Sequence, residues 1–228
     1  TIQSSFCLHR QHLSLTDGCE QPAWLVRYQF AGARQEPETT LQTFGYYSPT
    51  VETMLTFADS CWTARLSVSL GRPTLIRNAD LNLVGEGATL NPLRQLLQES
   101  TIKPGARFDH LDYESLKTGI EEMAARFGLV DGRFVLHEVA VDPDTHSADV
   151  RLTYDTGRRF RFGEISFEPD VVDDRLLQRH LPFARGDPYD AEQLSGLYQS
   201  LLDSGYFEEV SVRSSAIDLE GCNQAFVA

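Results

Sequence analysis

Histidine and aspartate residues that could hold a metal ion occur at two places in this sequence. His9 and His12 lie three residues apart, a spacing that would place two zinc ligands on one face of a helix. No helical pattern of apolar residues surrounds them, so an exposed segment is the simpler interpretation. Asp142, Asp144 and His146 form a second candidate cation site. Because Asp-Pro-Asp is also typical of tight turns, we interpret it as a polar turn and expect no metal and no cofactor.

Sequence motifs of common enzyme classes are absent or incomplete. Residues 85–87, Gly-Glu-Gly, resemble the start of a dinucleotide-binding loop, but the third glycine of that motif would fall at Leu90. The serine-hydrolase motif G-x-S-x-G does not occur. Adjacent acidic residues point in different directions on a helix or strand, so they cannot by themselves form a catalytic carboxylate pair. Three such pairs occur: Glu121-Glu122, Asp173-Asp174 and Glu208-Glu209. We therefore predict no catalytic residues.

Arginines gather at one place in this otherwise acidic chain. In a strand, Arg159 and Arg161 share one face, while Phe160 and Phe162 share the other. One interpretation is a half-buried strand with a salt-bridged outer face. The other is a rigid joint between two units of the chain, in which the arginines, Arg158 included, pair with acidic residues of the neighbouring unit. In both interpretations the phenylalanines belong to a core.

The composition is that of a folded, acidic protein. Of its 228 residues, 41% are hydrophobic, which is enough for packed cores. The net charge of -13 argues against a surface that neutralises phosphates, so nucleic acid is not an expected partner. No apolar stretch approaches the roughly 20 residues of a membrane-spanning helix. The four cysteines, Cys7, Cys19, Cys61 and Cys222, include no C-x-x-C pair that would indicate a metal finger or redox motif.

An internal repeat organises the elements that would position these residues. In its clearest copy, a strand over residues 159–167 precedes a short helix over residues 173–181. A longer helix then runs from about residue 190 to 204, with leucines at helical spacing. Gly205 ends this helix, and a strand follows at residues 207–212.

The preceding copy has the same order of elements. Its expected elements are a strand at 80–84, helices at 91–97 and 109–126, and strands at 133–141 and 148–154. Gly128 ends its second helix, and Gly45 lies 83 residues earlier, ahead of a strand that begins near Pro49. The sequence therefore predicts three units of one α+β design, each a three-stranded sheet packed under two helices in the order β-α-α-β-β. We expect the units to be strung out and Gly45, Gly128 and Gly205 to have positive φ.

Three segments carry a family resemblance: residues 44–51 (FGYYSPTV), 157–163 (GRRFRFG) and 181–189 (LPFARGDPY). They resemble POTRA (polypeptide-transport-associated) domains, and in particular the three tandem POTRA domains of the TamA family. TamA proteins are the outer-membrane subunits of the bacterial translocation and assembly module. The resemblance covers residues 39–212. It implies POTRA-like domains at 1–75, with an atypical N-terminal part, at 76–157 and at 158–213, followed by a C-terminal tail at 214–228, where a β-barrel would begin.

The resemblance also implies a location and partners. POTRA domains of this kind lie in the periplasm, as the soluble part of an outer-membrane protein. The expected role is a non-catalytic scaffold in outer-membrane protein assembly, especially of autotransporters. The implied partners are an inner-membrane-anchored TamB-like protein, unfolded outer-membrane protein clients, and the β-barrel of the full-length protein. At a periplasmic location at least one disulfide is expected, and Cys19 with Cys61 is the preferred pair.

Exposed sheet edges are the expected docking sites, because an edge can accept an added strand through main-chain hydrogen bonds. We single out two strands, Thr50–Leu55 and Val135–Val141. In the second strand, one face is apolar except for a histidine and the other is half-polar. The candidate partner-binding residues are Val135, His137, Val139 and Val141 in the second strand, and Val51 and Thr53 in the first.

Three alternatives remain open at this point. The first keeps the fold and assigns the chain to a BamA-type insertase or a two-partner secretion transporter, which usually carry five and two units respectively. The second is a periplasmic hydrolase or metal enzyme, which would need a cleft with perturbed acids or a metal. The third is a small-molecule binding module, which would need a pocket that domains of this size seldom contain.

Overall fold

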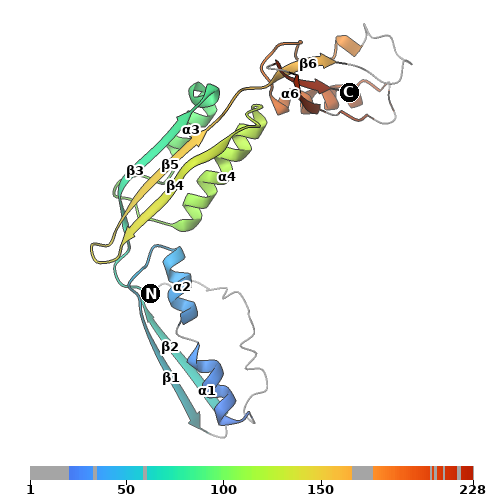
Figure 1. The fold of residues 1–228 in the computed structure, drawn as a ribbon. Coiled ribbons are helices and arrows are strands. Elements are labelled where there is room, and N and C mark those ends of the chain that lie inside the picture. The colour runs from blue at the N-terminus through green and yellow to red at the C-terminus, as the bar shows by residue number, and fades with distance from the viewer. Residues whose placement is uncertain are drawn as a thin grey trace.

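The chain forms three units that follow one another along an arc (Figure 1). The computed structural model describes residues 21–32, 35–58, 61–165, 177–205, 207, 210–212, 214–219 and 222–227. Two separate hydrophobic clusters form in the second and third units, so the described residues do not share one core. None of the described helices has the length and apolar character needed to cross a membrane.

The second unit contains the complete predicted order of elements. These are β3 (Leu75–Val84), a short 3-10 helix η2 (Glu86–Thr89), α3 (Asn91–Glu99), α4 (His110–Arg126), β4 (Arg133–Asp142) and β5 (Ser147–Asp155). The sheet order is β3-β5-β4, with β5 in the centre, parallel to β3 and antiparallel to β4. The last strand in sequence is therefore the central one, and β4 lies at an edge.

Helix α4 is defined by its ends and by one apolar face. The Asp109 carboxylate accepts a hydrogen bond from the Leu111 backbone N–H at 3.0 Å, which satisfies an amide that the helix leaves free. Gly128, just past the helix, has φ +73°, as predicted, and Gly45 and Gly205 have φ +82° and +71°. The buried face of α4 packs on the central strand; it consists of Tyr113, Leu116, Ile120 and Ala124, opposite Ala148, Val150, Leu152 and Tyr154 of β5.

The third unit repeats this design with a correction to the prediction. Its elements are β6 (Arg161–Ile165), α6 (Ala191–Asp203), β7 (Ser214–Leu219) and β8 (Cys222–Val227), in the sheet order β6-β8-β7. The predicted strand at 207–212 is wrong, because its described residues lie outside any strand. Residues 214–227 supply the two missing strands, so the unit continues past residue 213 and the expected tail is part of the sheet. The predicted helix at 173–181 lies mostly outside the described residues.

The polar sequence of β7 explains this error. Ser-Ser-Ala-Ile-Asp-Leu has no strong apolar alternation of its own. Pairing with β8 over the whole of β7 makes it a strand, and this long-range partner is invisible to a local pattern.

The first unit has α1 (Ala23–Ala31), α2 (Gln35–Thr43), β1 (Thr50–Ala58) and β2 (Cys61–Ser69). The two strands form an antiparallel hairpin. Helix α1 lies where the resemblance was lost, so helical structure extends further toward the N-terminus than the resemblance indicated. Cys61 is disulfide-bonded, and the predicted partner Cys19 lies outside the described residues.

Candidate docking site

The two edges of the second sheet differ in how their backbone groups are satisfied. Along β3, the loop between α3 and α4 occupies the outer side. The Ile76 N–H donates to the Ala106 carbonyl at 2.8 Å, and the Gly105 N–H donates to the Ile76 carbonyl at 2.7 Å. The Phe108 N–H donates to the Thr74 carbonyl at 2.9 Å. The beginning of the β3 edge is therefore closed to an added strand.

The third unit closes the edge of its own first strand in the same way. The Phe162 N–H donates to the Asp187 carbonyl at 2.9 Å, and the Gly186 N–H donates to the Phe162 carbonyl at 2.7 Å. The Tyr189 N–H donates to the Phe160 carbonyl at 3.0 Å. Covering an edge with a loop is a known protection against unwanted strand pairing, and here the helix–helix loop provides it twice.

No described segment covers the outer edge of β4 in this way. Strand β4 pairs only with β5, and no backbone hydrogen bond from another described segment reaches residues 133–142. This confirms that the predicted strand 133–141 is an edge strand. Its outward N–H and C=O groups are available for pairing, which makes β4 the best candidate docking site in the described part of the chain.

The side chains of β4 follow the predicted alternation only in part. His137, Val139 and Val141 lie opposite Leu152, Val150 and Ala148 of β5. They therefore share the side of the sheet that the helices cover, with His137 exposed and the two valines half-buried. Between Phe134 and Leu136 the register shifts, so the alternation that would place Val135 on this face is interrupted. Val135 is 52% exposed at this irregularity.

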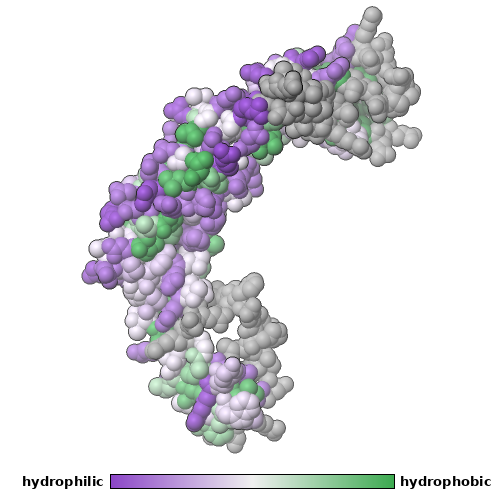
Figure 2. Space-filling model, in the orientation of Figure 1, coloured by the Kyte–Doolittle hydropathy of each residue, from purple (hydrophilic) through white to green (hydrophobic). Residues whose placement is uncertain are grey.

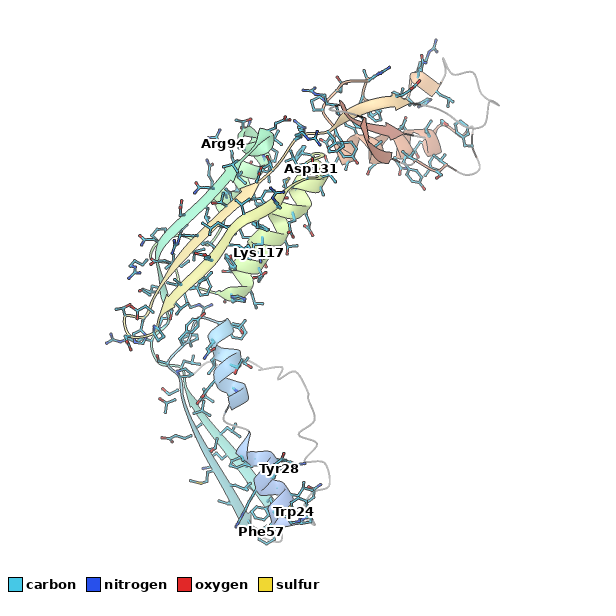
Figure 3. All side chains as sticks on the ribbon, viewed as in Figure 1. Trp24, Tyr28, Phe57, Arg94, Lys117 and Asp131 are labelled. Atoms are coloured by element: carbon cyan, nitrogen blue, oxygen red, sulfur yellow. The ribbon has the colours of Figure 1, made fainter. Side chains whose placement is uncertain are left out.

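Helix α4 borders the β4 edge with a lysine that sequence reasoning did not single out. The Lys117 ammonium lies 5.7 Å from the centre of the Phe134 ring and 5.5 Å from that of Tyr113. It is also 3.1 Å from a carboxylate oxygen of Glu114, one turn earlier. Figure 3 labels Lys117 midway along α4. A strand added to β4 would therefore meet this cation and the exposed His137 on its helix-facing side.

The candidate residues of the first unit lie on a different sheet. Val51 and Thr53 pair with Val68 and Leu66 of β2. Val51 is 2% exposed, so its side chain belongs to the interior and only its backbone could contribute to an edge. Strand β1 precedes the last strand of its unit, as β4 does, but the two candidate strands lie in separate units and form no common site (Figure 1).

The candidate metal residues have structural roles. A carboxylate oxygen of Asp142 accepts hydrogen bonds from the backbone N–H groups of Asp144, at 3.0 Å, and Thr145, at 3.3 Å. Hydrogen bonding by Thr145 holds the pKa of Asp142 below its ordinary value. This is the polar turn that the sequence indicated. Within the described ranges, no three His, Cys, Asp or Glu residues gather where they could hold a metal ion. His9 and His12 lie outside those ranges.

The Gly-Glu-Gly segment is a close-packed turn. The Gly87 N–H donates to the Thr156 hydroxyl at 2.8 Å, and the Thr156 hydroxyl donates to the Val84 carbonyl at 2.9 Å. A Cβ at Gly85 would lie 2.6 Å from that hydroxyl. The glycines thus allow the chain to approach Thr156, which explains them without a nucleotide.

The arginine cluster lies at the joint between the second and third units. The Arg159 guanidinium donates to the carbonyl of Phe127, at 3.2 Å, and to that of Tyr189, at 3.3 Å. Burial lowers the pKa of Arg159. Phe160 and Phe162 are 5% and 0% exposed, as both interpretations required. The structure supports the joint, although Arg159 uses backbone carbonyls rather than the acids that the prediction named.

Two other arginines, Arg158 and Arg126, form ion pairs with acidic residues at this joint. Arg158 lies 3.4 Å from Asp131. Arg126, which the sequence did not single out, lies 3.7 Å from Asp190 and 2.5 Å from Glu192, at the start of α6. Its position in the last turn of the predicted helix, two residues before Gly128, was the signal available in the sequence.

Comparison with known proteins identifies the two outer units. Residues 10–70 match the family described as "POTRA domain TamA domain 1", and residues 160–222 match the POTRA family described as "Surface antigen variable number repeat". The second match extends past residue 213, in agreement with the strand at Ser214–Leu219.

Solved structures of the same kind share low sequence identity with this chain. POTRA domains 3 to 5 of Haemophilus influenzae BamA are 20% identical, over 87% of this chain and 79% of that one, with a TM-score of 0.45. Haemophilus ducreyi BamA lacking POTRA domains 1 to 3 is 21% identical, with a TM-score of 0.47, over 66% of this chain and 28% of that one. CdiB from Escherichia coli is 15% identical over 93% and 35% of the two chains, with a TM-score of 0.38.

Proposed function

This chain is a POTRA-domain protein, and from that premise we propose that it docks partner proteins by accepting an extended segment at the open edge of β4. POTRA domains are scaffold domains of outer-membrane proteins that assemble or secrete other proteins, and they lie in the periplasm. The proposal assigns no catalytic step to this chain. Binding and positioning are its whole task.

One observation carries the proposal: in two units the loop between the helices bonds the beginning of the first-strand edge, while no described segment bonds the outer edge of β4. Backbone hydrogen bonds of 2.7 to 3.0 Å from these loops protect the beginnings of β3 and β6 against pairing with an added strand. The second-strand edge of the middle unit lacks that protection over its ten residues. In strand addition, main-chain hydrogen bonds supply affinity, and alternate side chains supply specificity.

The partners proposed for this edge are a TamB-type protein anchored in the inner membrane and unfolded segments of outer-membrane protein clients. The match of residues 10–70 to the first TamA domain supports a TamA-type assignment over a BamA-type insertase or a two-partner secretion transporter.

The side chains next to β4 indicate what an added strand would carry. His137 and Val139 on the helix-facing side offer an imidazole and an apolar surface, and Lys117 adds a cation paired with Glu114. On the opposite side, Glu138 lies 3.9 Å from Arg151, a pair exposed to solvent. A segment with apolar residues at every second position would bury them against Val139 and Val141.

Two proline variants test strand addition at this edge. Neighbouring residues of a strand direct their N–H groups to opposite sides, so Val139→Pro and Ala140→Pro remove one inward and one outward amide. Loss of the inward amide leaves a carbonyl of β5 unpaired and costs about 1–3 kcal/mol, visible as a lower melting temperature. The outward variant should melt as the parent does, and its affinity for the periplasmic end of a TamB-type protein should fall about tenfold or more.

The pair of variants contains its own control, because the melting temperatures identify which amide faces outward. The proposal is wrong if the stable variant binds the partner with the affinity of the parent. In that case β1, at Thr50–Leu55, becomes the next strand to test with the same pair of substitutions. Hydrolysis of a test substrate that depends on His137 or Asp144 would contradict the scaffold role itself.

A further inference from the structure

Three large aromatic side chains are exposed together at one end of the first unit. Trp24 and Tyr28 are 70% and 78% exposed, and Phe57 is 57% exposed. Figure 3 labels all three at the end of the unit that points away from the second unit. Trp24 and Tyr28 are four residues apart on α1 and so share one face of the helix. The ring centre of Phe57, near the end of β1, lies 4.9 Å from that of Trp62 in β2.

An exposed cation lies among these aromatic residues. Arg27 is three residues from Trp24 and one from Tyr28, and the described part of the chain contains no ion pair of its side chain. On the inward side of the same helix, Val26 is 2% exposed. Helix α1 therefore buries an aliphatic residue and presents tryptophan, arginine and tyrosine to solvent.

The net charge of the chain is distributed unevenly. Residues 1–75 contain six Asp or Glu and five Arg, so this unit accounts for only -1 of the total of -13. The remaining residues account for -12. Figure 2, which is coloured by hydropathy, shows pale and green residues with some purple ones at this end, and mostly purple residues with green patches on the second unit. An anionic surface would repel the second and third units strongly and the first unit only weakly.

We propose that this aromatic tip, defined as Trp24, Arg27, Tyr28 and Phe57, binds the surface of a phospholipid bilayer that contains anionic lipids. Tryptophan and tyrosine are enriched at the level of the headgroups, because their rings combine an apolar body with a polar edge. Arginine next to them is attracted to anionic headgroups. A few exposed aromatics and one cation give weak, reversible binding that weakens with salt.

The position of the tip favours a membrane over a protein partner. The labelled side chains come from a helix and a strand, and they project at the end of the molecule (Figure 3). A flat bilayer surface can contact such an end without a complementary groove. The strand edge proposed for protein docking lies in the second unit, so both contacts can form at once.

Both tryptophans of the chain, Trp24 and Trp62, lie in the first unit, so tryptophan fluorescence reports on this unit alone. The whole chain is mixed with vesicles of phosphatidylethanolamine and phosphatidylglycerol, and separately with vesicles of phosphatidylcholine alone. The expected result is a blue shift of the emission and co-sedimentation with the anionic vesicles, both reduced in about 0.5 M NaCl. The double variant Trp24→Ser, Tyr28→Ser should lose co-sedimentation about tenfold.

A matched control is Tyr198→Ser, which removes a 41% exposed aromatic from α6 in the acidic third unit and should not change binding. Both variants should melt as the parent does, because the replaced side chains are exposed. The proposal is wrong if the parent does not bind anionic vesicles, or if the double variant binds them as the parent does. A blue-shifted emission of Trp24 in the free protein, lost in Trp24→Ser, would show that the chain itself covers the tip, and would equally overturn the proposal.

Discussion

The two joints between units share one backbone arrangement. At the first, the Thr74 N–H donates to the Gly45 carbonyl at 2.8 Å. At the second, the Phe160 N–H donates to the Gly128 carbonyl at 2.9 Å. In each case the acceptor is a glycine with positive φ that follows the second helix of one unit. The donor is the residue directly before the first strand of the next unit. The cap that ends a helix thus also holds the next unit.

An aromatic residue from the next unit completes each joint. The Phe108 backbone approaches Gly45 so closely that a Cβ there would overlap the Phe108 carbonyl oxygen. Tyr189 fills the corresponding place at the second joint, where a Cβ on Gly128 would lie 2.8 Å from the Tyr189 Cβ. Each joint therefore requires its glycine for two reasons: the positive φ, and the close approach of a neighbouring residue that leaves no room for a Cβ.

The joints differ in their side-chain contacts. At the second, Arg159 bonds two carbonyls from different units, and Arg126 reaches Asp190 and Glu192 of α6. At the first, the corresponding contact is Arg107, whose guanidinium lies 5.8 Å from the centre of the Tyr46 ring. The shared backbone bonds set where a unit attaches, and in the described part of the chain hydrogen bonds and ion pairs of arginine side chains cross only the second attachment.

The largest expected effect comes from filling the glycine site of the first joint. Gly45→Ala should destabilise the first two units by more than the about 1–2 kcal/mol that a positive φ alone costs, because the added Cβ meets backbone that cannot move aside. Gly128→Ala should be milder, since the contacting atoms belong to the Tyr189 side chain. Calorimetric melting of both variants checks the order.

Gly205→Ala is the matched control for these two substitutions. Gly205 has φ +71°, and no described atom lies within 4 Å of an added Cβ, so only the cost of the positive φ remains. If Gly45→Ala melts no lower than Gly205→Ala, the close approach at the first joint is not what fixes that glycine.

A smaller effect should follow from Arg159→Met, which keeps most of the side-chain volume and removes the donors to Phe127 and Tyr189. We expect a loss of about 1–3 kcal/mol and separate melting of the second and third units. The corresponding change at the first joint, Arg107→Met, should cost only about 0.5–1 kcal/mol. Equal effects of the two substitutions on melting would contradict the difference between the joints.

The sequence predicted those parts of the molecule that local patterns encode. Gly45, Gly128 and Gly205 were identifiable because a glycine after a helical pattern indicates a left-handed cap. The edge position of β4 was indicated by the half-polar side chains of residues 135–141. The role of Arg159 remained one of two interpretations, because a strand pattern does not show which carbonyls of other units lie near its side chain.

Long-range contacts explain what the sequence did not reveal. Strands β7 and β8 are defined by their mutual pairing, and the cover over β3 and β6 consists of backbone hydrogen bonds that depend on no residue type. A signal for the cover was nevertheless present, since the turn glycines Gly105 and Gly186 recur 81 residues apart. The register shift in β4 and the lysine above Phe134 had no comparable signal.

Hydrogen–deuterium exchange of the whole chain, free and bound to the periplasmic end of a TamB-type protein, tests docking at β4 most directly. Resolved to single amides, it should show new protection on alternate residues of 133–142, because only every second N–H faces outward. The beginning of β3 should be unchanged, since its outer groups are already bonded within the unit. Unchanged exchange along β4 in a saturated complex would contradict docking at this edge.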